Sequence, residues 1–343
     1  MIKSLHWTSD GELSEDLEPA AFGQALADAE ALLWVDLFRE PAEVSRQILR
    51  DAFEFHPLAV DDALEERHVP RVDDWGAYLY VVLHAVSFDA AAQEEPLAAV
   101  ELDIFLGPNY VVTHHVRPIP ALTRVWSGCS EGACLGIPRG PVSSTVDNAA
   151  HLSAPYLLYR IADEMVTDTA PVIEEIDDRI DAIEDQVFAD PTRATLQATF
   201  TLRRALLRLR RVLGPQRDVF RTLAHADYAA VPSDEQVFFR DTYDQLLRLH
   251  QVGEGLRDLA DGALETYLSV VNYRMNEVMK LLAVITTLFL PLSFLAGFFG
   301  MNFFQPAAPL DAWTSRPALY IMLATMVLSP AAMAIWMRRR GWL

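Results

Sequence analysis

Leu281–Gly300 has the sequence LLAVITTLFLPLSFLAGFFG, and Ala318–Met337 has the sequence ALYIMLATMVLSPAAMAIWM. Neither stretch of twenty residues contains a charged side chain. At a rise of ~1.5 Å per residue, a helix of this length crosses a hydrocarbon core of ~30 Å. The segment between them opens with Gly300-Met301-Asn302. The sequence therefore predicts a membrane hairpin at the C-terminal end of the chain.

The rest of the chain is strongly acidic. Of 48 acidic and 28 basic residues, residues 281–343 hold one acid and four bases, which leaves 47 acids and 24 bases, a net charge of −23, in residues 1–280. Such a domain repels phosphates, which argues against nucleic acid as a partner. An acidic surface suits the collection of cations, and ordinary solubility is the alternative explanation.

Basic residues near the spans predict their orientation. Arg274 and Lys280 precede the first span, Arg338 to Arg340 follow the second, and Arg316 is the only base between them. Because basic residues are retained on the cytoplasmic side, both termini are expected in the cytoplasm, with a short external loop at about residues 301–316. No secretory signal is expected, because the first ten residues contain no apolar run.

Residues 1–150 predict a cytoplasmic α/β domain, so the fold class expected for the chain is α+β. Helices are expected at Pro41–Phe53 and Pro57–Arg67, each with a proline at its first position. Residues 117–147 are rich in Gly and Pro and are expected to be a connector, with Cys129 and Cys134 as loop residues in a reducing cytosol. Runs rich in Val, Tyr, Leu and Ile predict four strands: Leu32–Leu37, Tyr78–Phe88, Val100–Leu106 and Tyr110–His114.

Residues 151–280 predict a helical stalk. An acidic helix at about 151–189 and a basic helix at about 192–224 are expected to pair antiparallel, with opposite charges facing each other. The third helix begins near residue 232 and meets no proline before Pro291, which predicts one rod that continues into the membrane. Its apolar positions recur every 3.5 residues from Leu246 to Val270 and predict a coiled-coil-like seam, either between copies or within one subunit.

One face of the first span carries polar side chains. Thr286 and Ser293 are seven residues apart and therefore share a helix face, which continues through Leu290 and Gly297. Neutral oxygens with an apolar constriction between them suit a narrow conduit for a hydrated cation, and Mg²⁺ gives up its waters reluctantly. Two spans cannot enclose a path, so this interpretation needs several copies around an axis. The alternative is that the hydroxyls only bond within or between helices.

Four short sequence motifs, followed by a basic tail that ends in Trp342-Leu343, resemble those of a known protein family. The chain resembles the CorA family of magnesium and divalent-cation transport proteins along nearly its full length. The motifs occur in the order FHPLAVDD (residues 55–62), FRDTYD (239–244), MNEVMK (275–280) and FGMNF (299–303).

The resemblance implies a homopentameric channel of the bacterial inner membrane, with a funnel-shaped cytoplasmic domain and two transmembrane helices in residues 281–343. The implied pore and selectivity residues are Gly300, Met301 and Asn302 at the external mouth, Asn276 below, and Thr286, Ser293 and Gly297 between. The implied gate is Met279, Leu282 and Leu290, and the implied basic collar of the inner mouth is Lys280, Arg338, Arg339 and Arg340.

The resemblance also implies that cytoplasmic Mg²⁺, bound between subunits, holds the gate shut. Asp241 matches one such ligand and Asp89 is a looser match for its partner. The alternative is that Asp241 pairs within its own subunit with Arg240 or Arg248.

The external loop departs from the family pattern, because Asp311 is its only acid. A zinc- or cobalt-selective relative of the ZntB type and a non-conducting membrane-anchored sensor or scaffold therefore stay as alternatives to a passive, Mg²⁺-preferring channel. No phosphate-binding loop, Ser/His/Asp arrangement or HExxH motif is present. We therefore expect no enzymatic activity.

Overall fold

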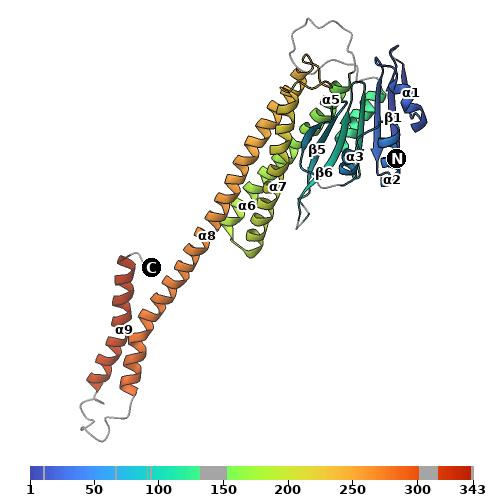
Figure 1. Cartoon of the computed structure of the whole chain (residues 1–343). Coiled ribbons are helices and arrows are strands. Elements are labelled where there is room, and N and C mark those ends of the chain that lie inside the picture. The colour runs from blue at the N-terminus through green and yellow to red at the C-terminus, as the bar shows by residue number, and fades with distance from the viewer. Residues whose placement is uncertain are drawn as a thin grey trace. The chain divides into compact units, whose positions relative to one another are not determined.

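The chain folds as two compact units, Met1–Leu264 and Glu265–Leu343, in the computed structural model. The structure describes residues 1–10, 12–65, 68–90, 92, 95–131, 153–300 and 316–340. The first unit contains a sheet and helices, and the second contains the end of a long helix followed by a second apolar helix (Figure 1). The α+β fold class predicted from the sequence is confirmed.

The first unit is built around a seven-stranded sheet with the order β2-β1-β3-β7-β6-β5-β4. Neighbouring strands are antiparallel except for the parallel pair β3 and β7. The four predicted strands correspond to β3, β5, β6 and β7, whereas β1, β2 and β4 were not predicted. The bounds are β1 Ile2–Trp7, β2 Leu13–Glu15, β3 Leu32–Phe38, β4 Arg71–Asp74, β5 Leu79–Phe88, β6 Leu97–Leu106 and β7 Tyr110–His115.

Helices cover both faces of this sheet because both faces are apolar. Side chains on one face, including Val35, Tyr80 and Phe105, form a core with helices that precede β4. Phe55 stacks on Phe105 in this core, with ring centroids 4.2 Å apart. The other face carries Trp34, whose ring lies 4.7 Å from that of Trp126. The helices before β4 are η1 Pro19–Ala21, α1 Phe22–Leu26, α2 Ala42–Asp51 and α3 Pro57–Leu64.

The central strand β7 ends in two histidines that face opposite sides of the sheet, because neighbouring side chains on a strand alternate. His114 Nδ1 lies 3.6 Å from Asp103 Oδ2 on β6, and His115 Nε2 lies 3.3 Å from Asp36 Oδ1 on β3. All four residues are buried. Burial raises the pKa of Asp103, whose Oδ1 also accepts a 2.6 Å hydrogen bond from the Tyr80 hydroxyl. Each of these buried histidines thus lies beside a carboxyl group on a neighbouring strand.

The helical part of the first unit differs from the prediction at two places. Residues 120–130, expected to belong to a connector, form the helix α4, and the remainder of that connector from residue 132 lies outside the described residues. The expected helix at 151–189 is divided at Asp168 into two helices. The bounds are α4 Pro120–Ser130, α5 Ala154–Thr167, α6 Thr169–Ala189, α7 Arg193–Leu223 and α8 Gln236–Gly300.

The basic helix α7 does not pair its charges with the acidic helix α6, and that prediction is wrong. Within the described part of the chain, the ion pairs of α7 with other helices reach α8 instead. Arg203 Nε lies 3.0 Å from Asp261 Oδ1, and Arg210 Nε lies 3.2 Å from Glu254 Oε1. The buried stripe of α6, which includes Ile176 and Ile180, faces inward and leaves the acids on the solvent side.

The sequence left open whether the apolar seam of α8 packs between copies or within one subunit. From Leu246 to Ala263 the seam packs within the same chain. Leu246, Leu256, Ala260 and Ala263 are buried within the first unit. A Cβ on Gly253 would lie 3.8 Å from Leu209 Cδ2 of α7, an ordinary van der Waals contact, so Gly253 faces α7 within the same chain. From residue 271 to residue 279 every side chain of α8 is exposed.

Candidate ion pathway and regulatory site

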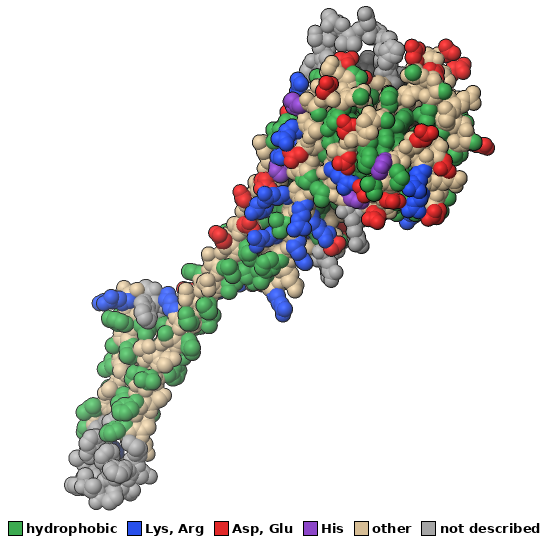
Figure 2. Space-filling view, viewed as in Figure 1, with side chains coloured by type: hydrophobic (Ala, Val, Ile, Leu, Met, Phe, Trp, Pro, Cys, Tyr) green, Lys and Arg blue, Asp and Glu red, His purple; other side chains and the backbone are tan. Residues whose placement is uncertain are grey.

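The second unit contains two helices that are long and apolar enough to cross a membrane: the C-terminal part of α8 and α9 (Arg316–Arg339). Large apolar side chains stay exposed along both of them, and Figure 2 shows the resulting hydrophobic surface. Exposure of such a large apolar surface to water is unfavourable, whereas contact of the same surface with lipid is not. Two C-terminal apolar helices therefore define a membrane protein.

One face of the α8 span is covered inside the second unit. Val284 is only 4% exposed, and the partly covered positions that follow repeat at helical spacing: Leu288, Pro291, Leu292, Leu295 and Phe298. On α9 the corresponding stripe ends at Met337, which is 2% exposed, and includes Met322, Met326, Ser329 and Met333. Methionine is unbranched and fills irregular gaps, which suits a helix-to-helix contact. In the described part of this unit, α9 is the partner of the covered face of α8.

The predicted pore stripe occupies the opposite face of α8, about half a turn from the covered one at roughly 100° per residue. All of its described side chains in the span are exposed: Leu282, Thr286, Leu290 and Ser293, with Gly297 in line. Leu290 is 68% exposed. We call this stripe the open face. It contains the hydroxyls of Thr286 and Ser293 and two of the three expected gate residues, Leu282 and Leu290, and no other element of the described chain covers it.

The hydroxyl of Thr286 bonds inside its own helix. Thr286 Oγ1 donates a 2.8 Å hydrogen bond to the Leu282 carbonyl oxygen. The hydroxyl proton of Thr286 is therefore used inside its own helix, as the alternative interpretation of the sequence expects. The oxygen keeps acceptor lone pairs, and a hydrated cation presents donors, not acceptors, to the wall of a pathway. Back-bonding and a lining role are thus compatible at this position.

The two ends of the predicted pathway are described unequally. Asn276 and Met279 lie on α8 before the span and are exposed, and Gly300 is the last residue of α8. Met301 and Asn302 lie outside the described residues. Among the expected collar residues, Lys280 is partly buried, Arg338 to Arg340 are exposed, and the guanidinium of Arg340 lies 5.5 Å from the ring centroid of Trp336.

Asp241, the expected regulatory ligand, sits in a small carboxylate site of the first unit. Its Oδ2 accepts a 2.9 Å hydrogen bond from Gln245 Nε2, and the same nitrogen donates to Asp163 Oδ1 of α5 at 3.2 Å. One amide thus joins two carboxylates. The alternative pairing of Asp241 with Arg240 or Arg248 is not found in the part of the chain that the structure describes.

Burial and negative charge shape this carboxylate site. The pKa of Asp163 is raised, chiefly by burial and further by Asp241. The pKa of Tyr159 is raised to about 12, again by burial first and then by Asp163 and Asp241. In both groups the ionised form is disfavoured, and a positive charge placed nearby would stabilise it. Sequence reasoning missed Asp163 and Gln245, although the four-residue spacing of Asp241 and Gln245 on one helix was a usable signal.

Asp89 lies on a different element, the connection between β5 and β6. It is exposed, and its backbone N–H donates a 2.7 Å hydrogen bond to the Pro96 carbonyl oxygen. Glu95 of the same connection forms an ion pair with Arg208 of α7, which ties this connection to the helices. Among the described residues, no three potential ligand side chains come close enough within one chain to hold a metal ion.

The fold and these spans define a two-span membrane protein, and comparison with known proteins identifies its family. The family described as "CorA-like Mg2+ transporter protein" matches residues 29–339. The cobalt/magnesium transport protein CorA of Thermotoga maritima is 31% identical over 87% of this chain and 79% of its own length. The chain belongs to the CorA family of divalent-cation transporters, a family of transporters and not of enzymes.

Two further comparisons extend this placement. The zinc transport protein ZntB of Yersinia pestis is 26% identical over 84% of this chain and 81% of its own length. The solved structure of the CorA magnesium transporter from Methanocaldococcus jannaschii matches with a TM-score of 0.79, covers 99% of this chain and 98% of that one, and is 21% identical. The structural likeness establishes the full-length fold.

Proposed function

We propose that this protein is a passive divalent-cation channel with a preference for Mg²⁺, formed by five copies arranged around the open face of α8. The observation that carries the proposal is that this face bears neutral oxygens and no charge, and stays uncovered in the single chain. A face with hydroxyls is poorly matched to lipid, so other copies of the same helix are its natural partners. Five such faces around an axis would enclose the pathway.

The lining suits an ion that keeps its water. Mg²⁺ dehydrates reluctantly, and neutral oxygens at Asn302, Ser293, Thr286 and Asn276 accept hydrogen bonds from its hydration shell without holding it tightly. Leu290, Leu282 and Met279 would close the pathway by excluding water. Lys280 and Arg338 to Arg340 would form the collar on the cytoplasmic side of the inner membrane, with both termini in the cytoplasm.

The test of conduction is an Asn302→Ala substitution at the external mouth. Mg²⁺ uptake into liposomes should be lost, while the mass of the purified assembly stays that of the parent. Gln305→Ala is the matched control, because it removes an amide from the same external segment and should leave uptake unchanged. Unchanged uptake by Asn302→Ala would remove the pore assignment, and absence of uptake by the parent would favour a non-conducting sensor or scaffold.

Zinc or cobalt is the second candidate cargo, favoured by the names of two relatives, a zinc transport protein and a cobalt/magnesium transport protein. Co²⁺ and Zn²⁺ bind nitrogen and sulfur ligands more strongly than Mg²⁺ does, but the open face supplies chiefly oxygen and apolar groups. Mg²⁺ is therefore placed first. Competition of Co²⁺ and Zn²⁺ against Mg²⁺ uptake measures the order, and inhibition by micromolar Zn²⁺ with transport of Zn²⁺ itself would reverse it.

Regulation is proposed to occur at the carboxylate site of Asp241 and Asp163. Two unit charges at 4 Å repel by ~1 kcal/mol in bulk water and by more where solvent is excluded. A divalent cation between these carboxylates and Asp89 of a neighbouring copy would replace repulsion by a bridge. If the cation binds the closed assembly more tightly, low cytoplasmic Mg²⁺ opens the gate. Influx then limits itself.

Limited proteolysis with and without millimolar Mg²⁺ tests this regulation. Mg²⁺ should protect the parent and fail to protect Asp241→Ala. Asp244→Ala is the matched control, since Asp244 is an exposed acid three residues further along the same helix, and its protection should persist. Equal protection of the parent and Asp241→Ala would remove the carboxylate site from the mechanism, while leaving the conduction test untouched.

A further inference from the structure

A groove between α7 and α8 of the first unit has a basic side chain at four of its eight lining positions. Its volume is about 480 Å³, in the range of sites that hold small molecules. Three arginines and one histidine line it against a single acid, Asp218. Figure 2 shows that Lys and Arg side chains gather over this helical part of the first unit. The lining residues are Leu207, Arg210, Arg211, Gly214, Pro215, Arg217, Asp218 and His250.

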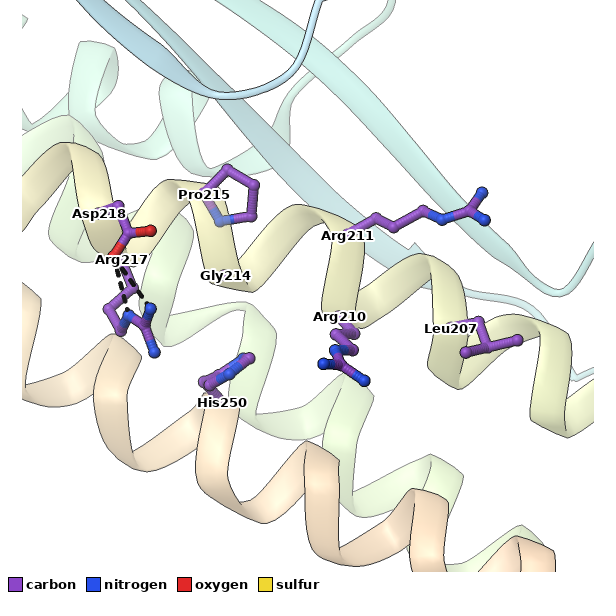
Figure 3. A pocket seen from close by; sticks show the side chains of 8 residues that line it. All are labelled: Leu207, Arg210, Arg211, Gly214, Pro215, Arg217, Asp218 and His250. Atoms are coloured by element: carbon purple, nitrogen blue, oxygen red, sulfur yellow. Dashed lines mark hydrogen bonds and ion pairs between the residues drawn. The ribbon is translucent and has the colours of Figure 1, made fainter.

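Two of the arginines and the histidine converge. In Figure 3, Arg210 and Arg217 extend from α7 toward α8 and flank the ring of His250, whereas Arg211 points away along α7. Arg217 is held by a 2.9 Å hydrogen bond to Asp218, and Arg210 pairs with Glu254. Glu254 is shared with Arg257, at 3.5 Å, so its one charge serves two guanidinium groups. Positive charge is therefore in excess in the groove.

Burial and the charges of the groove both act on the histidine. The pKa of His250 is lowered, first by burial and then by the nearby charge of Arg217 and Arg210. The groove thus already disfavours one more positive charge, even though Glu254 and Asp218 act in the opposite direction. An anion bound between the two arginines would relieve this and let the imidazole accept a proton.

The backbone at the groove is made of two residues that a helix interior disfavours. Gly214 and Pro215 lie in the middle of α7, where glycine adds conformational freedom to the unfolded chain and proline removes a hydrogen bond. A Cβ on Gly214 would lie 3.8 Å from His250 Cε1, so the space beside the imidazole is open because no side chain projects there. A longer side chain at this position would extend into the groove.

We propose that this groove binds a phosphate group, with Arg210 and Arg217 as hydrogen-bond donors and His250 as a third, conditional donor. Arginine presents a planar set of donors that matches phosphate oxygens, and a protonated imidazole would add a further one. The phosphate comes either as inorganic phosphate or as part of a nucleotide, for which the volume of the groove is sufficient. This proposal does not depend on ion conduction.

Calorimetric titration of the full-length assembly tests it, with sodium phosphate and with ATP as separate probes. EDTA is present throughout so that ATP cannot act by removing Mg²⁺, and sodium chloride at equal ionic strength is the blank. Arg217→Gln should weaken binding roughly tenfold or more, the value of one charge-assisted hydrogen bond. Arg204→Gln, an exposed arginine of α7 outside the groove, should not.

Blocking the groove gives a second measurement. Gly214→Gln should abolish binding, while Gly255→Gln, at a helical glycine with open space around it, should preserve it. Histidine hydrogen–deuterium exchange should show the His250 pKa rising with phosphate and not with chloride. Binding of phosphate, of ATP or of both that is weakened by Arg217→Gln and by Gly214→Gln supports the site. The probe that binds shows whether the ligand is inorganic phosphate or a nucleotide. Failure of both probes at 10 mM, an equal response to chloride, or undiminished binding by Arg217→Gln would overturn the proposal.

Discussion

The sheet of the first unit buries both polar and apolar side chains, whereas the α8 span of the second unit leaves both kinds exposed. In the sheet, Asp103, His114 and Phe105 are all buried, and the two titratable side chains lie beside each other on neighbouring strands. In the span, Leu290 and Phe294 are 68% and 69% exposed, and hydroxyls stand beside them. The sheet is complete as one chain. The span is completed only by what surrounds it, so identical substitutions should have different consequences in the two places.

The largest contrast is expected from removing a phenylalanine ring. Phe105 is 0% exposed and stacks on Phe55, so Phe105→Ala should destabilise the sheet by about 3–5 kcal/mol through lost contacts and a residual cavity. Phe294→Ala in the α8 span should leave the same transition unchanged. Urea denaturation of the purified assembly, followed by near-ultraviolet circular dichroism of the first unit, measures both. Similar shifts for the two variants would contradict the contrast.

A pH dependence of intermediate size should be confined to the sheet. Burial first, and the charges of Arg117 and His68 second, lower the pKa of His84 to about 4. Between this pH and about 6.5 the unfolded chain binds the proton and the folded one does not, so stability should rise with pH by up to roughly 3 kcal/mol. Denaturation midpoints of the parent between pH 4 and 7, compared with His84→Gln, measure this contribution. Identical slopes for the two proteins would show that His84 does not carry it.

The smallest effect on stability should accompany a large effect on conduction. Leu290→Ser lies on the open face and should shift unfolding of the sheet by less than about 0.5 kcal/mol. It should nevertheless raise leak under closing conditions, because a hydroxyl gives water a foothold in an apolar constriction. Val327→Ser, on α9 and similarly exposed at 67%, is the matched control and should not leak. If both variants leak alike, the open face is not the pathway.

Sequence patterns identified the elements that can be recognised from their own composition, without knowledge of their neighbours in the fold. Val-rich and Tyr-rich runs predicted β3, β5, β6 and β7, and uncharged runs predicted both spans, because burial on both faces and immersion in lipid each demand a continuous apolar segment. The strand β1 was missed, since Ile2–Trp7 mixes Lys3, Ser4 and His6 with apolar residues and becomes a strand by pairing with β3. The helix α4 was hidden by its glycine and by the Gly/Pro-rich segment after it.

The carboxylate site was only half predictable. Asp241 was found because it stands in a motif, whereas Asp163 lies 82 residues before Gln245 and meets it through the packing of α5 on α8. Local spacing contains no information about that contact. The charge pairing of α7 failed for the same reason, because which helix faces Arg203 and Arg210 depends on tertiary packing and not on adjacency in the chain.

The two histidines at the end of β7 also fix how the central strand is aligned. Their partners stand on opposite faces of the sheet and on different strands, Asp103 on β6 and Asp36 on β3. A shift of β7 by one residue would turn each imidazole to the face that lacks its acid and leave two carboxyl groups buried without these partners. The parallel pairing of β3 with β7, which joins segments distant in sequence, is therefore disfavoured in any register that is shifted by one residue from the observed one.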